Sequence, residues 1–386
     1  MNVWASNVLV WLQHLAGKWV AEIIAGALIL VAGFVGTKLW KWIKALIDYH
    51  HRMQRALSAV ARVGSKSQLR EGSGLWLAPP MEGAASAAYE TNIEACRILV
   101  VANAKGGVGK TTVSANIGAR LAEILSKPVL MIDLDFQGTL SSMSIAEHGR
   151  WVPPKGQDSR ATHLISGDLT PTEIANWGLS AAGQPNLRVV PAFYDLAQAE
   201  NREMVEWLLS DRQTDIRFRL ADILHDPAVR NAFSLIIIDS PPRLTTGAIQ
   251  ALAAGTHLLI PTILDEPSAE AVVTFVRQVE TFRKAKLCPY IRHIGVVGSL
   301  NLTQQNTDGP KRRLSDRLRD SWDEYGCGGV TNLLPENTYL PRSRFFRTAV
   351  AGGGIAYLSL GDSQEAKPIK DAIIALAEHV RKEMRI

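Results

Sequence analysis

The sequence predicts an α/β fold with a doubly wound, mostly parallel sheet, preceded by an apolar helix and a linker. Three observations predict it. The short run 98–101 is apolar and β-branched, as a buried parallel strand is, and a glycine-rich loop and a helical pattern follow it directly. Two further apolar runs, 128–133 and 234–239, each end in an aspartate. Residues 23–36 carry no charge, so the N-terminal quarter differs in character from the rest.

The loop after the first strand reads Lys-Gly-Gly-Val-Gly-Lys-Thr-Thr over residues 105–112. Glycines let the backbone curl so that its N–H groups point at phosphate oxygens, and a helix N-terminus adds positive potential there. Lys110 supplies a charge for the β- and γ-phosphates, and Thr111 supplies a hydroxyl for Mg²⁺. We therefore expect a P-loop domain that binds ATP and Mg²⁺. Its expected nucleotide-binding residues are Gly106, Gly107, Val108, Gly109, Lys110, Thr111 and Thr112.

The loop departs from the usual G-x-x-x-x-G-K-[ST] pattern, because Ala104 stands at the first glycine and Lys105 follows it. This string resembles the deviant Walker A loop of the ParA/MinD ATPases. In that family the extra lysine reaches across a dimer interface to the nucleotide of the partner. The resemblance implies a homodimer that sandwiches ATP, with Lys105 and Lys110 among the catalytic residues.

The second strand runs into two carboxylates, Asp133 and Asp135, at its C-terminal end. Such an end faces the phosphate loop, where Mg²⁺ and its water shell need oxygen ligands. The string from 133 to 138 resembles the family motif Asp-x-Asp-Pro-Gln-Gly, with Phe136 in place of proline. The resemblance implies that Asp135 orients the attacking water and that Asp133 sits near the metal.

The buried strand 234–239 ends in Asp239 and is typical of a Walker B element, in which the aspartate holds Mg²⁺ through water. The expected metal site is therefore Thr111, Asp133 and Asp239. Three widely separated cysteines provide neither a disulfide framework nor a zinc site; they are Cys96, Cys288 and Cys327.

The rest of the domain, predicted as residues 93–386, keeps a β–α rhythm. Expected strands are 187–191, 258–261 and 293–300, and expected helices are 113–125, 195–209, 245–254, 268–284 and 368–382. The resemblance covers about residues 96–383. By that resemblance, Asn301 touches the adenine, and the loop containing Pro335 lies on the adenine side.

The N-terminal region is predicted as a segment 1–18, a transmembrane helix 19–42, a basic juxtamembrane helix 43–63 and a flexible linker 64–92. Tryptophans flank the apolar run, and most nearby basic residues follow it. This asymmetry predicts a single-pass protein of a bacterial inner membrane, with the ATPase domain in the cytoplasm. The apolar period of residues 38–63 fits either a parallel coiled coil or a helix on anionic lipid.

The charge is unevenly distributed. Residues 1–75 hold nine Lys/Arg and three Asp/Glu, whereas the remaining 311 hold 33 and 34, so the ATPase domain is close to neutral. Two basic clusters stand out, one at 311–319 and one formed by Arg342, Arg344 and Arg347. Non-specific DNA binding is one interpretation of them, but a solvated helix face is favoured.

These observations predict a membrane-anchored, ATP-dependent dimerising ATPase switch that positions, recruits or gates an unknown protein partner. One alternative is an ATP-gated signalling or defence scaffold with little turnover. A second is an ATPase like the bacterial tyrosine kinases. That alternative is disfavoured because those proteins carry a C-terminal tyrosine cluster, and Tyr357 is the only tyrosine after Tyr339.

Overall fold

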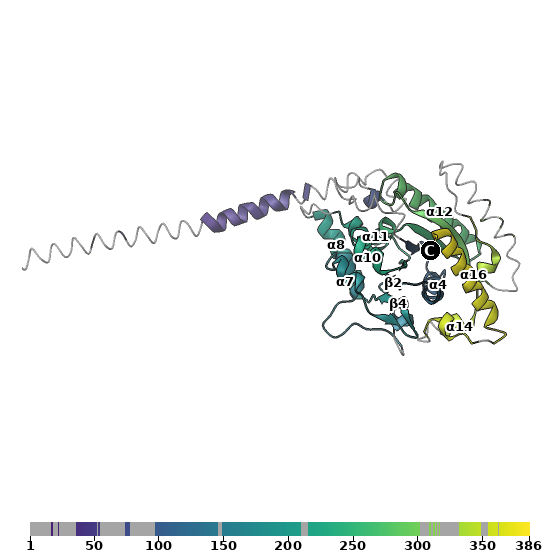
Figure 1. Cartoon of the computed structure of the whole chain (residues 1–386). Helices are drawn as coiled ribbons and strands as arrows, with labels where there is room; N and C mark the ends of the chain where they lie inside the picture. Colours follow the sequence, from purple (N-terminus) through teal and green to yellow (C-terminus); the bar gives the residue numbers. More distant parts are fainter. Residues whose placement is uncertain are drawn as a thin grey trace, which may run out of the picture. The chain divides into compact units, whose positions relative to one another are not determined.

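The computed structural model describes nine stretches of the chain: residues 36–51, 53–54, 74–77, 97–145, 149–209, 215–301, 332–348, 354–361 and 363–386. It also describes the single positions 17, 22, 309, 312, 314 and 316. The chain divides into two units, Met1–Ser58 and Ala59–Ile386, and the sheet belongs to the second (Figure 1).

In the first unit, residues 36–51 are helical. Within the described stretches, no helix is long and apolar enough to cross a membrane. The helix at residues 36–51 is unsuited to cross a membrane because it carries four charged side chains, Lys38, Lys41, Lys44 and Asp48. The predicted single-pass location in the inner membrane is therefore wrong on this finding. Apart from residue 22, the apolar run 19–35 lies outside the described residues.

The second unit is built on an eight-stranded sheet in the order β3-β4-β2-β5-β1-β6-β7-β8. Neighbouring strands pair in parallel, except for the antiparallel pair β3–β4. The strands are β1 (Ile98–Val101), β2 (Val129–Asp133), β3 (Ser180–Ala181), β4 (Gln184–Val190), β5 (Leu235–Asp239), β6 (His257–Thr262), β7 (Arg292–Asn301) and β8 (Leu340–Pro341).

The chain leaves the central strand β1 toward β2 on one side and later places β6 on the other side. This reversal of winding direction defines a topological switch point, and ligands bind at the carboxyl ends of the strands there. The predicted doubly wound, mostly parallel α/β fold is confirmed. The phosphate loop leaves the carboxyl end of β1, so the fold places it at this switch point.

Helices cover both faces of the sheet (Figure 1). Helices α4 and α16 pack against each other. The longer helices are α4 (Lys110–Ile124), α8 (Asp195–Leu209), α11 (Thr246–Ala254), α12 (Glu266–Lys284) and α16 (Lys367–Met384). The shorter ones are α5 (Thr139–Ile145), α6 (Arg160–Ser166), α7 (Pro171–Ala175), α9 (Arg219–Leu224), α10 (Pro227–Ala232), α14 (Arg344–Thr348) and α15 (Ala356–Ser359). Single 3₁₀ turns are η1 (Gly74–Leu77), η3 (Ile216–Phe218) and η4 (Glu336–Thr338).

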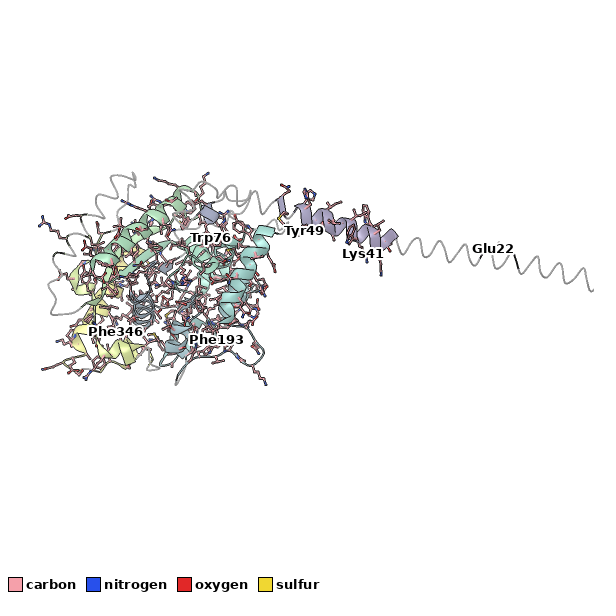
Figure 2. All side chains as sticks on the ribbon, turned by 180° about the vertical axis from the view of Figure 1, so that it is seen from behind. Glu22, Lys41, Tyr49, Trp76, Phe193 and Phe346 are labelled. Carbon is pink, nitrogen blue, oxygen red and sulfur yellow. The ribbon has the colours of Figure 1, made fainter. Side chains whose placement is uncertain are left out.

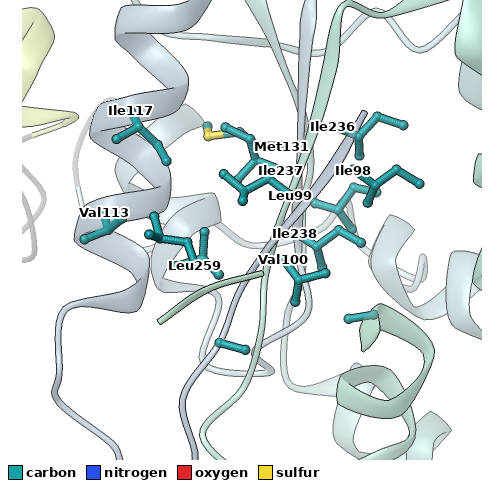
Figure 3. Packing of buried hydrophobic residues seen from close by; sticks show 14 of the residues in the cluster. Ile98, Leu99, Val100, Val113, Ile117, Met131, Ile236, Ile237, Ile238 and Leu259 are labelled. Carbon is teal, nitrogen blue, oxygen red and sulfur yellow. The ribbon is translucent and has the colours of Figure 1, made fainter. Parts of the chain in front are cut away.

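The central strands are apolar on both faces because helices cover both (Figure 3). Met131 and Ile237 point toward α4, whereas Ile236 and Ile238 point to the opposite face. A Cβ atom at Gly118 would lie 2.8 Å from the Met131 sulfur. The absence of a side chain at Gly118 therefore lets α4 approach the sheet closely, which fixes the helix that carries Lys110.

Part of the predicted linker lies within the second unit and packs against the rest of it. Residues Gly74–Leu77 form η1, and the buried ring of Trp76 (labelled in Figure 2) stacks on Trp207 with ring centroids 6.0 Å apart. Arg217 Nη1 donates to the Trp76 carbonyl at 2.8 Å, and the same guanidinium forms a buried ion pair with Asp215. These four residues are thus held by stacking and by a buried cation, which the Gly- and Ser-rich composition of the linker does not indicate.

Candidate nucleotide site

The glycines of the phosphate loop are required by its backbone conformation. Gly107 and Gly109 have φ values of 72° and 83°, which side-chain-bearing residues seldom adopt. Gly109 is also the N-cap of α4, and a Cβ there would lie 3.0 Å from the Ser299 hydroxyl oxygen. That hydroxyl donates to the Val108 carbonyl, so β7 supports the loop from one side. The loop therefore has the strand, curl and helix start that the motif predicts.

Lys110 is the first residue of α4, and its side chain turns back into the loop. Its Nζ donates to the Lys105 carbonyl at 3.0 Å. Burial lowers the pKa of Lys110, and the charges of Asp239 and Asp135 oppose this shift. A partly buried cation inside a curl of backbone suits the β- and γ-phosphates of a nucleotide.

Two buried carboxylates lie side by side at the ends of neighbouring strands, because Asp133 and Asp239 are register partners on β2 and β5. Burial raises the pKa of Asp133 to about 7 and, together with repulsion from Asp133, that of Asp239 to about 8. A nearby cation would favour the charged form of both. The two carboxylates therefore lie together at the carboxyl edge of the sheet.

The hydrogen bonds divide the two aspartates by role. Asp133 accepts from the amide and hydroxyl of Ser141 at 2.9 and 2.7 Å and from the Asp135 amide at 3.1 Å. Asp239 accepts from the Ser114 hydroxyl at 3.1 Å and from the Thr111 side chain. Asp133 therefore anchors the following loop, whereas Asp239 and Thr111 lie together beside the phosphate loop.

The side chains present fit Mg²⁺. Within the described part of the chain, no three His, Cys, Asp or Glu side chains gather as a metal cage. Mg²⁺ commonly keeps several waters and takes one or two carboxylates with substrate phosphates, so Thr111 and Asp239 are a sufficient protein contribution. When bound, the ion would neutralise phosphate charge. Whether Asp133 also contacts it stays a prediction.

Asp135 lies in a tight turn that we call the switch loop, residues 134–138. Its carboxylate accepts from the Gln137 amide at 3.0 Å, and its carbonyl accepts from the Gly138 amide at 2.8 Å. Gly138 has a φ of 60°, and a Cβ there would lie 2.6 Å from the Ala192 carbonyl oxygen. The glycine is therefore required for the turn that presents Asp135 beside the phosphate loop.

Lys105 is engaged within its own chain. Its Nζ donates to the Ser268 hydroxyl at 2.6 Å and lies 3.5 Å from Asp265 Oδ1, at the start of α12. The Lys105 side chain is 31% exposed. The two partners were missed at the sequence level, although Asp265 three residues before Ser268 is a recognisable N-cap pattern. Lys105 thus has acidic and hydroxyl partners away from Lys110.

The adenine-side predictions lie at the edge of the described structure. Asn301 is the last residue of β7, but its side chain lies outside the described residues. Pro335 is exposed and precedes η4. Both roles stay predictions.

The basic clusters and the C-terminal tyrosine are only partly described. Most of the basic stretch 311–319 also lies outside the described residues, and Arg344 pairs with Glu365. Tyr357 is buried, with its hydroxyl donating to Glu123 at 2.7 Å.

Glu200 is a further buried acid near the site, and the sequence analysis did not identify it. Its Oε1 accepts from the Gly247 amide at 2.8 Å and from the Thr245 hydroxyl, so it joins α8 to the start of α11. Burial raises the pKa of Glu200 from 4.5 to about 7, and the nearby charge of Asp135 adds to the shift.

Glu200→Gln should therefore stabilise the fold at pH 8 and have little effect near pH 5. Between pH 4.5 and 7 the folded chain keeps a proton that the unfolded chain has lost, so stability falls as pH rises through that window. The amide keeps an acceptor oxygen and carries no charge, which should add on the order of 2 kcal/mol at pH 8. Urea unfolding at both pH values, with the exposed Glu270→Gln as control, measures this. A less stable Glu200→Gln variant at pH 8 would contradict it.

Known proteins resemble this chain in sequence and in fold. The family model described as "AAA domain" matches residues 96–291. The chromosome partitioning protein ParA of Caulobacter vibrioides is 28% identical over 275 residues, covering 68% of this chain and 92% of that protein. The sporulation initiation inhibitor protein Soj of Bacillus subtilis is 32% identical over 188 residues, covering 49% of this chain and 66% of that protein.

Two solved structures share the fold. Apo McdA of Cyanothece has a TM-score of 0.56 at 21% identity, covering 74% of this chain and all but 1% of that one. The septum site-determining protein MinD of Pyrococcus horikoshii, complexed with Mg-ADP, has a TM-score of 0.50 at 17% identity, covering 74% of this chain and 95% of that one. These two structures show the fold, whereas the domain match, the sequence relatives and the loop geometry above agree on one family assignment. The chain belongs to the AAA domain family and, within it, to the ParA/MinD group of P-loop ATPases.

Proposed function

We propose that this protein is an ATP- and Mg²⁺-dependent ATPase that dimerises around bound ATP and uses this change to position or recruit a protein partner. The observation that carries the proposal is that the two lysines of the phosphate loop, Lys110 and Lys105, have side chains in different environments. Lys110 lies inside the phosphate loop, whereas the partly exposed Lys105 side chain rests on Ser268 and Asp265. A chain that hydrolysed ATP alone would not need the second cation.

In the proposed dimer, Lys105 of each copy leaves Asp265 and stabilises charge that develops on the nucleotide of the other copy. Lys110 holds the β- and γ-phosphates of its own nucleotide. Asp135 orients the attacking water from the switch loop, and Thr111 and Asp239 hold Mg²⁺. Hydrolysis removes the γ-phosphate that both copies contact, so the dimer separates. The protein is then a switch with two states.

The relatives support positioning as the purpose of the switch. The ParA relative is named for chromosome partitioning, and the MinD neighbour for determining the septum site. Both names describe the placing of another cellular component. We propose the same class of role here, with a protein partner that responds to the ATP-bound dimer.

A kinetic measurement tests this proposal. If each site needs Lys105 of a second copy, ATP turnover per chain should rise with chain concentration and level off once dimers predominate. A steady-state assay over a hundredfold range of chain concentration, with saturating Mg²⁺–ATP, measures this. Turnover that is constant across the range would contradict the shared site. Nucleotide binding without any turnover would favour the alternative of an ATP-gated scaffold.

A further inference from the structure

The switch loop lacks the residue that stiffens it in the family motif, because Phe136 stands in place of proline. Proline fixes φ near −65° and so limits the conformations of a turn. Among the described residues, the Phe136 amide donates to no backbone carbonyl, so a proline there would remove no bond between main-chain groups. The turn that carries Asp135 therefore needs another restraint in this chain.

Arg150 supplies contacts that could act as this restraint. Its Nη2 donates to the Gln137 carbonyl at 2.6 Å, and its Nη1 donates to the Tyr194 hydroxyl. The guanidinium carbon lies 3.8 Å from the centroid of the Tyr194 ring. The Phe136 ring also contacts Tyr194, with the two ring centroids 6.3 Å apart. One arginine and one tyrosine thus hold both residues that follow Asp135.

Arg150 and Tyr194, which we call the clamp, are themselves held by neighbouring helices of the fold. Tyr194 directly precedes α8, and its neighbour Phe193 (labelled in Figure 2) makes an edge-on contact with Trp151 at 6.5 Å. The Trp151 amide donates to the Ser142 hydroxyl at 3.1 Å. Movement of Arg150 is therefore limited by α5 on one side and by the start of α8 on the other.

We propose that Arg150 is a positioning residue for Asp135, and that it replaces the missing proline by holding the Gln137 carbonyl against Tyr194. The proposal rests on the proposed function, in which Asp135 orients the attacking water. Arg150 touches neither nucleotide nor water in this role. It acts by keeping the turn between Asp135 and Gly138 in one conformation.

Arg150→Ala should lower kcat by roughly 10- to 100-fold, because small displacements of an orienting group are costly to the chemical step. ATP affinity and KM should change by less than about twofold, since the phosphate loop is untouched. An exposed cation–π contact adds little to folding, so the unfolding midpoint should hardly move. Arg160→Ala is the matched control, because that guanidinium lies 5.2 Å from the Trp177 ring, away from the switch loop.

The second variant distinguishes positioning from a general structural role. Phe136→Pro added to Arg150→Ala should restore most of kcat, because the ring again limits the turn. Hydrogen exchange of the Gln137 and Gly138 amides gives a readout independent of turnover; it should accelerate in Arg150→Ala and slow again in the double variant. Unchanged kcat and unchanged exchange in Arg150→Ala would overturn the proposal, as would a double variant without recovery. A wild-type chain that binds but never hydrolyses ATP would overturn the proposed function alone, because the exchange measurement still tests the clamp.

Discussion

Lys110→Ala is expected to abolish ATP binding at ordinary nucleotide concentrations. The side chain is the cation enclosed by the phosphate loop, with its Nζ 3.0 Å from the Lys105 carbonyl. Without this ammonium group, the negative charge of the β- and γ-phosphates has no cation beside it in the loop. A charge-assisted hydrogen bond contributes up to about 3 kcal/mol, so affinity should fall on the order of 100-fold or more.

Titration of purified chain with a fluorescent ATP analogue measures this loss. Lys127→Ala is a suitable control, because Lys127 bonds the Asn231 carbonyl on the surface, away from the loop. The control should bind as the wild-type chain does. If Lys110→Ala binds ATP with unchanged affinity, then residues 105–112 are not the nucleotide site.

Lys105→Ala should have an effect as large, but on turnover and not on binding. The residue lies outside the enclosed part of the loop and contacts Ser268 and Asp265. Loss of an exposed ion pair costs little stability, and Lys110 still holds the phosphates. Removing a cation from developing charge commonly costs a factor of 10² or more in rate. Parallel measurement of kcat and ATP affinity separates the two effects, and a variant that loses affinity in proportion would contradict the assignment in trans.

Much of the fold could be predicted from the sequence, because its strands are short apolar runs with abrupt polar ends. The strand 98–101 and the helix 195–209 have the observed bounds, and the other predicted strands and helices differ by a few residues at their ends. The short strands and helices of the second unit were not predicted; they are β3, β8, α5, α6, α7, α9, α10, α14 and α15. The phosphate loop was predictable for a stronger reason. Gly107 and Gly109 have positive φ values, which favour glycine, so the glycines in the sequence already indicate the conformation of the loop.

The contacts between distant segments could not be predicted in the same way. The partners of Lys105 come from the start of α12. In the switch loop, Arg150 contacts Gln137 and Tyr194 contacts Phe136, although both lie far from the loop in sequence. Glu200 looks like an ordinary helix residue until the start of α11 covers it. The membrane prediction took Lys38 and the next two lysines as flanking an apolar span, whereas they lie within the described helix 36–51, and no described helix is long and apolar enough to cross a membrane.

The central claim is that ATP joins two copies of the chain through Lys105, and molar mass tests it most directly. Light scattering is measured on the full chain carrying Asp135→Ala, which should bind ATP without hydrolysing it, with and without Mg²⁺–ATP. The account predicts a doubling of mass with ATP, and no doubling once Lys105→Ala is added. A chain that stays monomeric with ATP, or an ATP-dependent dimer that survives Lys105→Ala, would contradict it.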